Sequence, residues 1–173
     1  TYTAGWNIAQ FTISFKTDGG NEVESITQDY NTEVNFNEIP VKKGYTFTGW
    51  DKAVPDVMPA GNIVITAQWK KDIYTISYNL DGGKADNPET YEVDTSVITL
   101  KRPQRTGYTF TGWSGTGIDG TAMDPVITTG STGNRSYTAN WKENSYVIRF
   151  IPYGDGTTGS MQDMPVSYTH LTL

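Results

Sequence analysis

The chain has 173 residues, a formal net charge of −6 and a pI near 4.7. It contains no cysteine, which excludes disulfides, thiolate nucleophiles and cysteine-ligated metal sites. Lysine and arginine form no block, which argues against nucleic acid as a partner. The segment contains no run of eighteen apolar residues, so the sequence predicts no membrane-spanning helix in it.

The opening residues repeat a sequence that also closes later segments. Residues 2–6 read YTAGW, residues 137–141 read YTANW, and residues 65–69 (ITAQW) occupy the same place between them. We therefore expect residues 1–7 to be the end of a preceding repeat.

A longer repeat follows. The heptapeptide GYTFTGW occurs at 44–50 and at 107–113, so the offset is 113 − 50 = 63 residues. The same offset carries FTISF at 11–15 onto YTISY at 74–78. We define module 1 as residues 8–72 and module 2 as residues 73–144, joined by short linkers. A period of this size is typical of arrays in which function is distributed along the chain.

Both modules show the apolar–polar alternation of half-buried strands, at 11–16 and 74–79 near their starts and at 63–70 and 137–141 near their ends. An Asp-Gly-Gly turn follows the first strand. We expect a second strand over 25–36 and 90–100, and then one helical turn after Pro40 and Pro103. Within GYTFTGW, the parity of the aromatic residues predicts a bulge at Gly49 that turns the next indole inward.

Module 2 is longer than module 1 by nine residues, because the closing tryptophans are 141 − 69 = 72 apart. The insert lies within residues 114–135, where glycine, threonine and serine predict an exposed loop. Such a loop is a candidate for specificity, although exposed loops also accept insertions at little cost. If the loop binds a ligand, the candidate residues are Asp119, Arg135 and Trp113.

Residues 145–164 begin a third copy that stops short. Residues 165–173 look like the translation of a transposase adapter used in sequencing libraries, and the start of this tail could instead be native strand.

The DGG turn, the GYTFTGW block after a proline and the A-x-W ending together resemble the Listeria-Bacteroides repeat of internalin-like proteins. The resemblance covers almost all of residues 8–142. It implies a mainly β, small α+β module with a β-grasp-like fold and at most a short helical segment. It also implies a place on secreted or wall-attached bacterial proteins, often adhesins. The family has no catalytic residues, cofactor or general set of binding residues to transfer.

The residues themselves offer few catalytic or metal sites. His170 is the single histidine and lies in the tail. Scattered carboxylates could in principle form an acid–base pair, but neither module concentrates them. The aspartates of the Asp-Gly turns, Asp18, Asp81 and Asp155, could contact calcium, but turn chemistry explains them more simply because calcium requires six to eight oxygens.

Large aromatic residues recur at matching positions in both modules: Trp50, Trp69, Trp113 and Trp141, with Tyr45 and Tyr108. They could stack on sugars or supply the core of a small module. The core interpretation predicts that replacing Trp50 or Trp113 with alanine unfolds the module that contains it.

These features favour a non-enzymatic stalk or spacer of an extracellular or wall-attached bacterial protein, in which the neighbouring repeats are the main partners. The alternative is a weak multivalent adhesive module that binds a glycan or host protein through residues 114–135.

Overall fold

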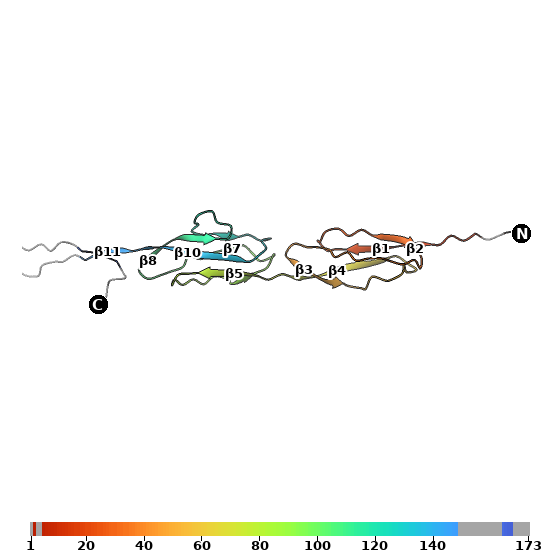
Figure 1. Cartoon of the computed structure of the whole chain (residues 1–173), viewed down its shortest axis with the longest axis horizontal. Coiled ribbons are helices and arrows are strands. Elements are labelled where there is room, and N and C mark those ends of the chain that lie inside the picture. The colour runs from red at the N-terminus through yellow and green to blue at the C-terminus, as the bar shows by residue number, and fades with distance from the viewer. Residues whose placement is uncertain (1, 3–4, 149–163, 168–173) are drawn as a thin grey trace, which may run out of the picture. The chain divides into compact units, whose positions relative to one another are not determined.

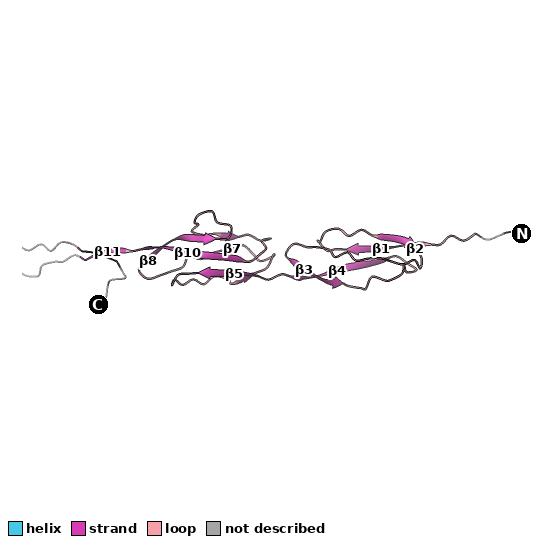
Figure 2. Ribbon diagram, viewed as in Figure 1, coloured by secondary structure: helices cyan, strands magenta, loops and turns pink. Residues whose placement is uncertain are grey.

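The computed structural model describes residues 2, 5–148 and 164–167, which fall into two compact units. The first unit contains residues 1–73 with the short segments 92–94 and 130–132, and the second contains the rest. The described residues form strands and loops and no helix (Figure 2). The mainly β prediction is confirmed for them.

The first unit is built on a mixed four-stranded sheet with the order β2-β1-β4-β3 (Figure 1). β1 and β4 pair in parallel at its centre, and both outer strands are antiparallel to their neighbours. The strands are β1 (Gln10–Lys16), β2 (Ile26–Asp29), β3 (Tyr45–Trp50) and β4 (Ile63–Lys71).

The second unit repeats this scheme with the order β6-β5-β10-β8. Its strands are β5 (Tyr74–Asn79), β6 (Thr90–Tyr91), β8 (Tyr108–Gly115) and β10 (Arg135–Glu143). A small additional pair joins β7 (Ile98–Thr99) to β9 (Val126–Ile127). The repeated sequence therefore produces a repeated topology, although the β-grasp assignment itself stays a prediction.

Two strands lie beyond module 2. β11 (Ser145–Ile148) pairs with β12 (Met164–Ser167) in antiparallel register. β12 contains the first residues of the predicted adapter-derived tail, while residues 149–163 and 168–173, with Asp155 and His170, lie outside the described residues. The pairing does not test where the native sequence ends.

The predicted second strand is too long in both modules. In module 1 it shortens to β2, because Asn31 has a positive φ of 64° that takes the chain out of the extended conformation. In module 2 it is divided into β6 and β7, with a turn at 93–94 between them. The polar pairs Asn31-Thr32 and Asp94-Thr95 lie where the extended segments end.

The predicted helical turns after Pro40 and Pro103 are also wrong. A tight turn takes their place in each module: the Tyr45 N–H donates to Lys42 O at 3.1 Å, and the Tyr108 N–H donates to Arg105 O at 3.2 Å. The glycine before each tyrosine, with φ of 79° at Gly44, makes this turn possible.

The Asp-Gly-Gly sequence forms a type I′ turn, because both central residues have positive φ, 45° at Asp81 and 80° at Gly82. The Gly83 N–H closes the turn on Leu80 O at 2.9 Å. A Cβ on Gly83 would lie 2.5 Å from the Trp141 ring, so the second glycine is required by packing rather than by φ. The corresponding distance in module 1 is 2.8 Å.

The bulge predicted at Gly49 is confirmed. The register of β3 on β4 shifts between Phe47 and Gly49, where φ is 131°. The ring centroids of Phe47 and Trp50 consequently lie 5.3 Å apart in an edge-to-face arrangement. Module 2 repeats the arrangement, with 5.5 Å between Phe110 and Trp113.

Each unit has its own core. The buried cluster of the first unit is Ile13, Val34, Met58 and Ile65. That of the second unit is larger and more aromatic: Ile76, Tyr91, Leu100, Trp113, Ile127, Tyr137 and Ala139. Trp113 is fully buried, whereas Trp50 packs at the margin of its core and is half-buried.

Candidate functional site

The insert of module 2 is folded onto the module rather than projecting as a free loop. Trp113 and Ala122 exchange two backbone hydrogen bonds of 2.7 and 2.9 Å. The Arg102 guanidinium donates to both carboxylate oxygens of Asp124, at 2.8 and 2.5 Å. β9 lies within the insert and adds Ile127 to the core. Residues 114–135 are therefore held by backbone hydrogen bonds, an ion pair and a short strand, which the expectation of an exposed loop did not include.

A cleft of about 290 Å³ lies beneath this insert. Two of the three residues proposed from the sequence, Asp119 and Arg135, line it. The other lining residues are Thr116, Gly117, Ile118, Ala122, Pro125, Val126 and Tyr137. We call this cleft the insert pocket.

Arg135 starts β10 on the side of the strand that faces the core, since it alternates in phase with the buried Tyr137 and Ala139. Its Nε donates to the Tyr91 hydroxyl at 3.0 Å, and that hydroxyl donates to Gly133 O at 2.5 Å. The guanidinium carbon lies 5.7 Å from the centroid of the Tyr91 ring. Packing thus fixes the arginine at the edge of the core.

The guanidinium remains charged in this position. Partial burial acts to lower the pKa of Arg135, but hydrogen bonds with the hydroxyls of Tyr91 and Tyr137 raise it overall. No carboxylate of the described residues lies within ion-pair distance of it. The insert pocket therefore contains a positive charge that hydroxyl groups solvate and no acidic side chain neutralises.

The other two candidates differ sharply. Asp119 is exposed, between Ile118 and Gly120 on the wall of the pocket. Trp113 has 0% of its surface exposed and belongs to the core, so it has no ring face to offer a ligand. Its role as a binding residue stays a prediction, and the burial of the indole does not favour it.

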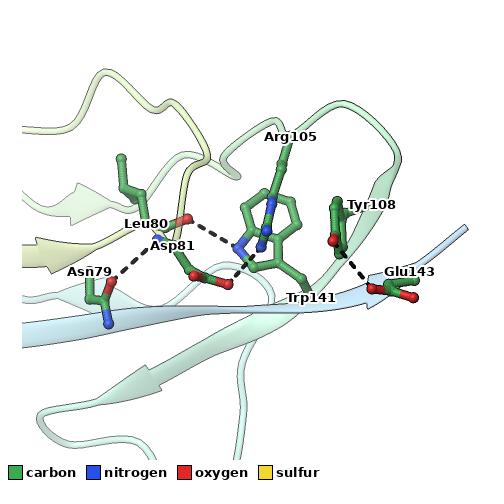
Figure 3. A network of polar contacts seen from close by, with 7 residues as sticks. All are labelled: Asn79, Leu80, Asp81, Arg105, Tyr108, Trp141 and Glu143. Carbon is green, nitrogen blue, oxygen red and sulfur yellow. Dashed lines mark hydrogen bonds and ion pairs between the residues drawn. The ribbon is translucent and has the colours of Figure 1, made fainter. Parts of the chain in front are cut away.

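A second cluster of cationic and aromatic residues surrounds the Asp-Gly-Gly turn of module 2 (Figure 3). The Arg105 guanidinium lies 3.7 Å from the centroid of the Tyr108 ring and pairs with Asp81 at 2.6 Å. The Trp141 indole N–H donates to Leu80 O at 3.1 Å. These contacts hold the Asp-Gly-Gly turn against the tight turn at residues 105–108 and against β10.

Module 1 repeats this cluster with lysine in place of arginine. Lys42 Nζ lies 4.3 Å from the Tyr45 ring and donates to Asp18 O at 2.7 Å. The Trp69 indole donates to Thr17 O at 2.9 Å. Its recurrence in both modules identifies the cluster as scaffold. The sequence signal was the cation at the same place before each GYTFTGW block, which sequence reasoning missed.

Asn134, which precedes β10, and Asn62, which precedes β4, also have structural roles. The Asn134 side-chain oxygen accepts from the Thr75 N–H at 3.0 Å, and Asn62 does the same for Thr12 at 2.8 Å. Among the described residues, no group of three or more acidic or histidine side chains is placed to hold a metal ion.

Comparison with known families gives a direct result. The model of the Listeria-Bacteroides repeat domain matches residues 11–68 and 74–142, which is most of the chain. The chain belongs to the Listeria-Bacteroides repeat family.

Relatives that contain similar sequence are longer proteins. Internalin H of Listeria monocytogenes serovar 1/2a is 32% identical over 143 residues, which cover 78% of this chain and 25% of that protein. Two proteins of Evansella cellulosilytica, whose names class them as membrane proteins, are 28% and 27% identical over 87% and 89% of this chain. The chain spans 24% and 19% of their lengths.

No solved structure matches the chain significantly. In the described part of the chain, no helix has the length and apolar character needed to cross a membrane.

The residues around Arg135 distinguish one Listeria-Bacteroides repeat of this chain from the other. By strand register, the positions of Arg135 and Tyr137 in module 2 correspond to those of Ile63 and Ile65 in module 1. The partner of Arg135, Tyr91, is replaced by Gln28. Module 1 therefore has the same sheet without a positive charge at this position.

Proposed function

We propose that these repeats form a non-enzymatic stalk or spacer within a larger secreted or cell-surface bacterial protein of the adhesin type. Membership of the Listeria-Bacteroides family and the similarity to Internalin H support this setting. The observation that carries the proposal is a hydrogen-bonded clamp that recurs at the end of each module.

The clamp of module 1 holds the first residue after β4. The Asp72 N–H donates to Gly44 O at 3.0 Å, and the Thr46 hydroxyl donates to the Asp72 carboxylate at 2.5 Å. Because β4 reaches Lys71 and β5 begins at Tyr74, only Ile73 lies between this clamp and the next strand.

The clamp of module 2 has the same design. The Asn144 N–H donates to Gly107 O at 2.9 Å, and the Thr109 hydroxyl donates to the Asn144 side-chain oxygen at 2.6 Å. β11 begins at the next residue, Ser145. Beyond the clamped residue, at most one residue therefore separates each closing strand from the next strand.

Such a clamp serves a spacer because it removes backbone freedom where two modules join. Each residue left free contributes roughly 1–2 kcal/mol of conformational entropy, which resists an extended arrangement. Two hydrogen bonds to one linker residue, each worth about 1 kcal/mol net, offset that loss. Stability in such an array then adds along the chain.

Backbone ¹⁵N relaxation at Asp72, Ile73 and Asn144 tests this proposal. We expect order parameters near those of the flanking strands, about 0.85. In a Thr46→Val, Thr109→Val double variant we expect them to fall, while the strands themselves keep their values. Linker order parameters below about 0.6 in the unaltered chain would contradict a spacer.

A second candidate function is weak adhesion to a glycan or host surface protein, made effective by repetition. The insert pocket favours it, because Asp119 and Arg135 line one cleft and module 1 has Ile63 at the position of Arg135. Display of the chain on beads, beside a version without the nine-residue insertion, tests it. Binding that requires the insertion supports adhesion, and binding that survives without it contradicts this site.

A further inference from the structure

We propose that the insert pocket binds the carboxylate of an acidic sugar residue of the uronic acid type, with Arg135 as the anion-binding group. The inference rests on the adhesive function and gives it a ligand class. It is independent of the spacer.

The first argument is the unusual position of the charge. Arg135 occupies a core-facing strand position that holds Ile63 in module 1. Placing a charge at the edge of a core costs free energy unless a partner compensates for the lost water. The other described arginines, Arg102 and Arg105, each have a carboxylate partner, at 2.5 and 2.6 Å. Arg135 has tyrosine hydroxyls instead, so an external carboxylate would complete its surroundings.

The second argument is the geometry of the guanidinium. Its Nε is occupied by the Tyr91 hydroxyl, which holds the plane of the group. Nη1 lies 3.9 Å from the position that a Cβ on Gly117 would take. Because residue 117 has no side chain, no side-chain atom of that residue covers the terminal nitrogens. The Tyr137 hydroxyl takes one further hydrogen bond. The remaining N–H groups of the two terminal nitrogens can donate two hydrogen bonds to one carboxylate.

The third argument is the remainder of the pocket. Its volume of about 290 Å³ lies at the small end of ligand sites, which suits one ring rather than a folded segment. Ile118, Pro125 and Val126 supply apolar surface for a ring face, and the Asp119 carboxylate can accept hydrogen bonds from sugar hydroxyls.

The same residue explains why the ligand should have a single negative charge. Asp119 and the net charge of −6 disfavour phosphate, which has nearly twice the charge of a carboxylate. An acidic peptide can also donate to Asp119 through its backbone N–H groups, so it is one of the outcomes of the test. A uronic acid combines one carboxylate, which Arg135 can bind, with several hydroxyls, which can donate to Asp119.

Amide chemical-shift titration of the full chain tests the inference, with sodium glucuronate, glucose, sodium acetate and a short glutamate-containing peptide as probes. We expect millimolar binding of glucuronate, with shifts centred on Gly117, Ile118 and Arg135. Matching positions around Ile63 should stay unchanged, since module 1 lacks the cation. Glucose and acetate should each bind at least tenfold more weakly.

The variants separate recognition from folding. Arg135→Met should lower glucuronate affinity at least tenfold, and Lys101→Met, which removes a positive charge from an exposed surface pair, should leave it within twofold. Arg135→Lys keeps the charge and should weaken binding at least threefold, because lysine lacks the planar fork. If the methionine variant does not fold, the lysine variant decides.

Several results would overturn the inference. Equal binding of glucose would remove the role of the carboxylate, and equal binding of acetate would remove the sugar. Tighter binding of the peptide would indicate a protein partner. Unchanged affinity in a folded Arg135 variant would exclude the site. None of these results alters linker relaxation, so the spacer stands or falls separately.

Discussion

The two modules share a sheet topology and differ in the segment between their third and last long strands. Both place a parallel strand pair at the centre, close an Asp-Gly-Gly turn with an indole N–H, and shift register at the GYTFTGW bulge. Module 2 pairs β7 with β9 where module 1 has a single bridge between Glu33 and Val57, and its Trp113 is fully buried while Trp50 is half-buried. Met58 is buried at the matching place in module 1, so the residues around β9 keep a core contact that both modules make.

The comparison shows that the same sheet and turns can be kept while the residues around one segment change. The residues that close the turns and clamp the linkers recur in both modules, so their roles are structural. The residues around Arg135 do not recur, and Ile63 at the matching place in module 1 is a partly buried residue that packs against the core. Differences between otherwise matched modules are the places to search for recognition.

The largest expected difference concerns the two tryptophans of the GYTFTGW blocks. Trp113→Ala should lower the free energy of unfolding of module 2 by about 3 to 5 kcal/mol, because the whole indole leaves a cavity. Trp50→Ala should cost module 1 less, about 2 kcal/mol, because part of that indole already meets solvent. Hydrogen exchange resolved by residue measures both modules in one chain. Equal costs would contradict the difference in burial.

The second glycine of the turn should be nearly as sensitive. Gly83→Ala should destabilise module 2 by about 3 kcal/mol, since the new methyl would lie 2.5 Å from the Trp141 ring. Gly20→Ala should cost less, because the corresponding distance to Trp69 is 2.8 Å. Chemical denaturation of each variant measures the loss, and wild-type stability in either would show that the indole moves freely.

Alkaline pH should separate the modules, because Tyr78 of module 2 stands where module 1 has Phe15. Burial, with smaller contributions from Tyr137 and Glu89, raises the pKa of Tyr78 to about 12. The folded-state pKa is above the unfolded value of about 10, so this stabilisation is complete below pH 10 and is lost as the pH rises through 12.

The expected loss is on the order of 2 kcal/mol for module 2. Stability curves between pH 9 and 12 should therefore be flatter for Tyr78→Phe than for the unaltered chain. The Tyr78 hydroxyl donates to Pro88 O at 2.8 Å, so the variant also loses one hydrogen bond at every pH. Curves of the same slope would show that Tyr78 does not cause the pH dependence.

The smallest effect should come from the ion pair that anchors the insert. The hydrogen bond from Arg102 lowers the pKa of Asp124. A lowered folded-state pKa gives stability that is present above the unfolded value of about 4 and is lost as the pH falls through the folded value. Both side chains are about half exposed, at 54% and 48%, so the effect should be slight.

Asp124→Asn should remove this acid dependence while leaving module 1 unchanged. Amide exchange at Ala122 and Ile127, measured at pH 7 and pH 3, reports the insert directly. A wild-type response to acid in the asparagine variant would show that the pair does not anchor it.

Local pattern predicted a good part of the fold. Alternation located β1, β4, β5 and β10, and the parity of Tyr45, Phe47 and Trp50 located the bulge. The Asp-Gly-Gly turn followed from the conformational needs of its residues. These features depend on neighbouring residues, which a single sequence displays.

Features that depend on distant contacts could not be predicted in this way. The helical turns after the prolines were replaced by tight turns that Lys42 and Arg105 tie to the Asp-Gly-Gly turns. The burial of Trp113 depends on the insert folding back over it. Asp119 and Arg135 were named from their place in the insert. The tyrosines that hydrogen-bond the Arg135 guanidinium lie on β6 and β10, and the sequence does not show that they meet it.

The distance between spin labels at Thr48→Cys and Thr111→Cys tests the spacer most directly. Both positions are exposed, and the absence of native cysteine makes the labelling specific. A spacer with clamped linkers predicts a narrow distance distribution, which broadens when Thr46 and Thr109 are both replaced by valine. A distribution that is already broad in the unaltered chain, and unchanged by the double variant, would contradict the account.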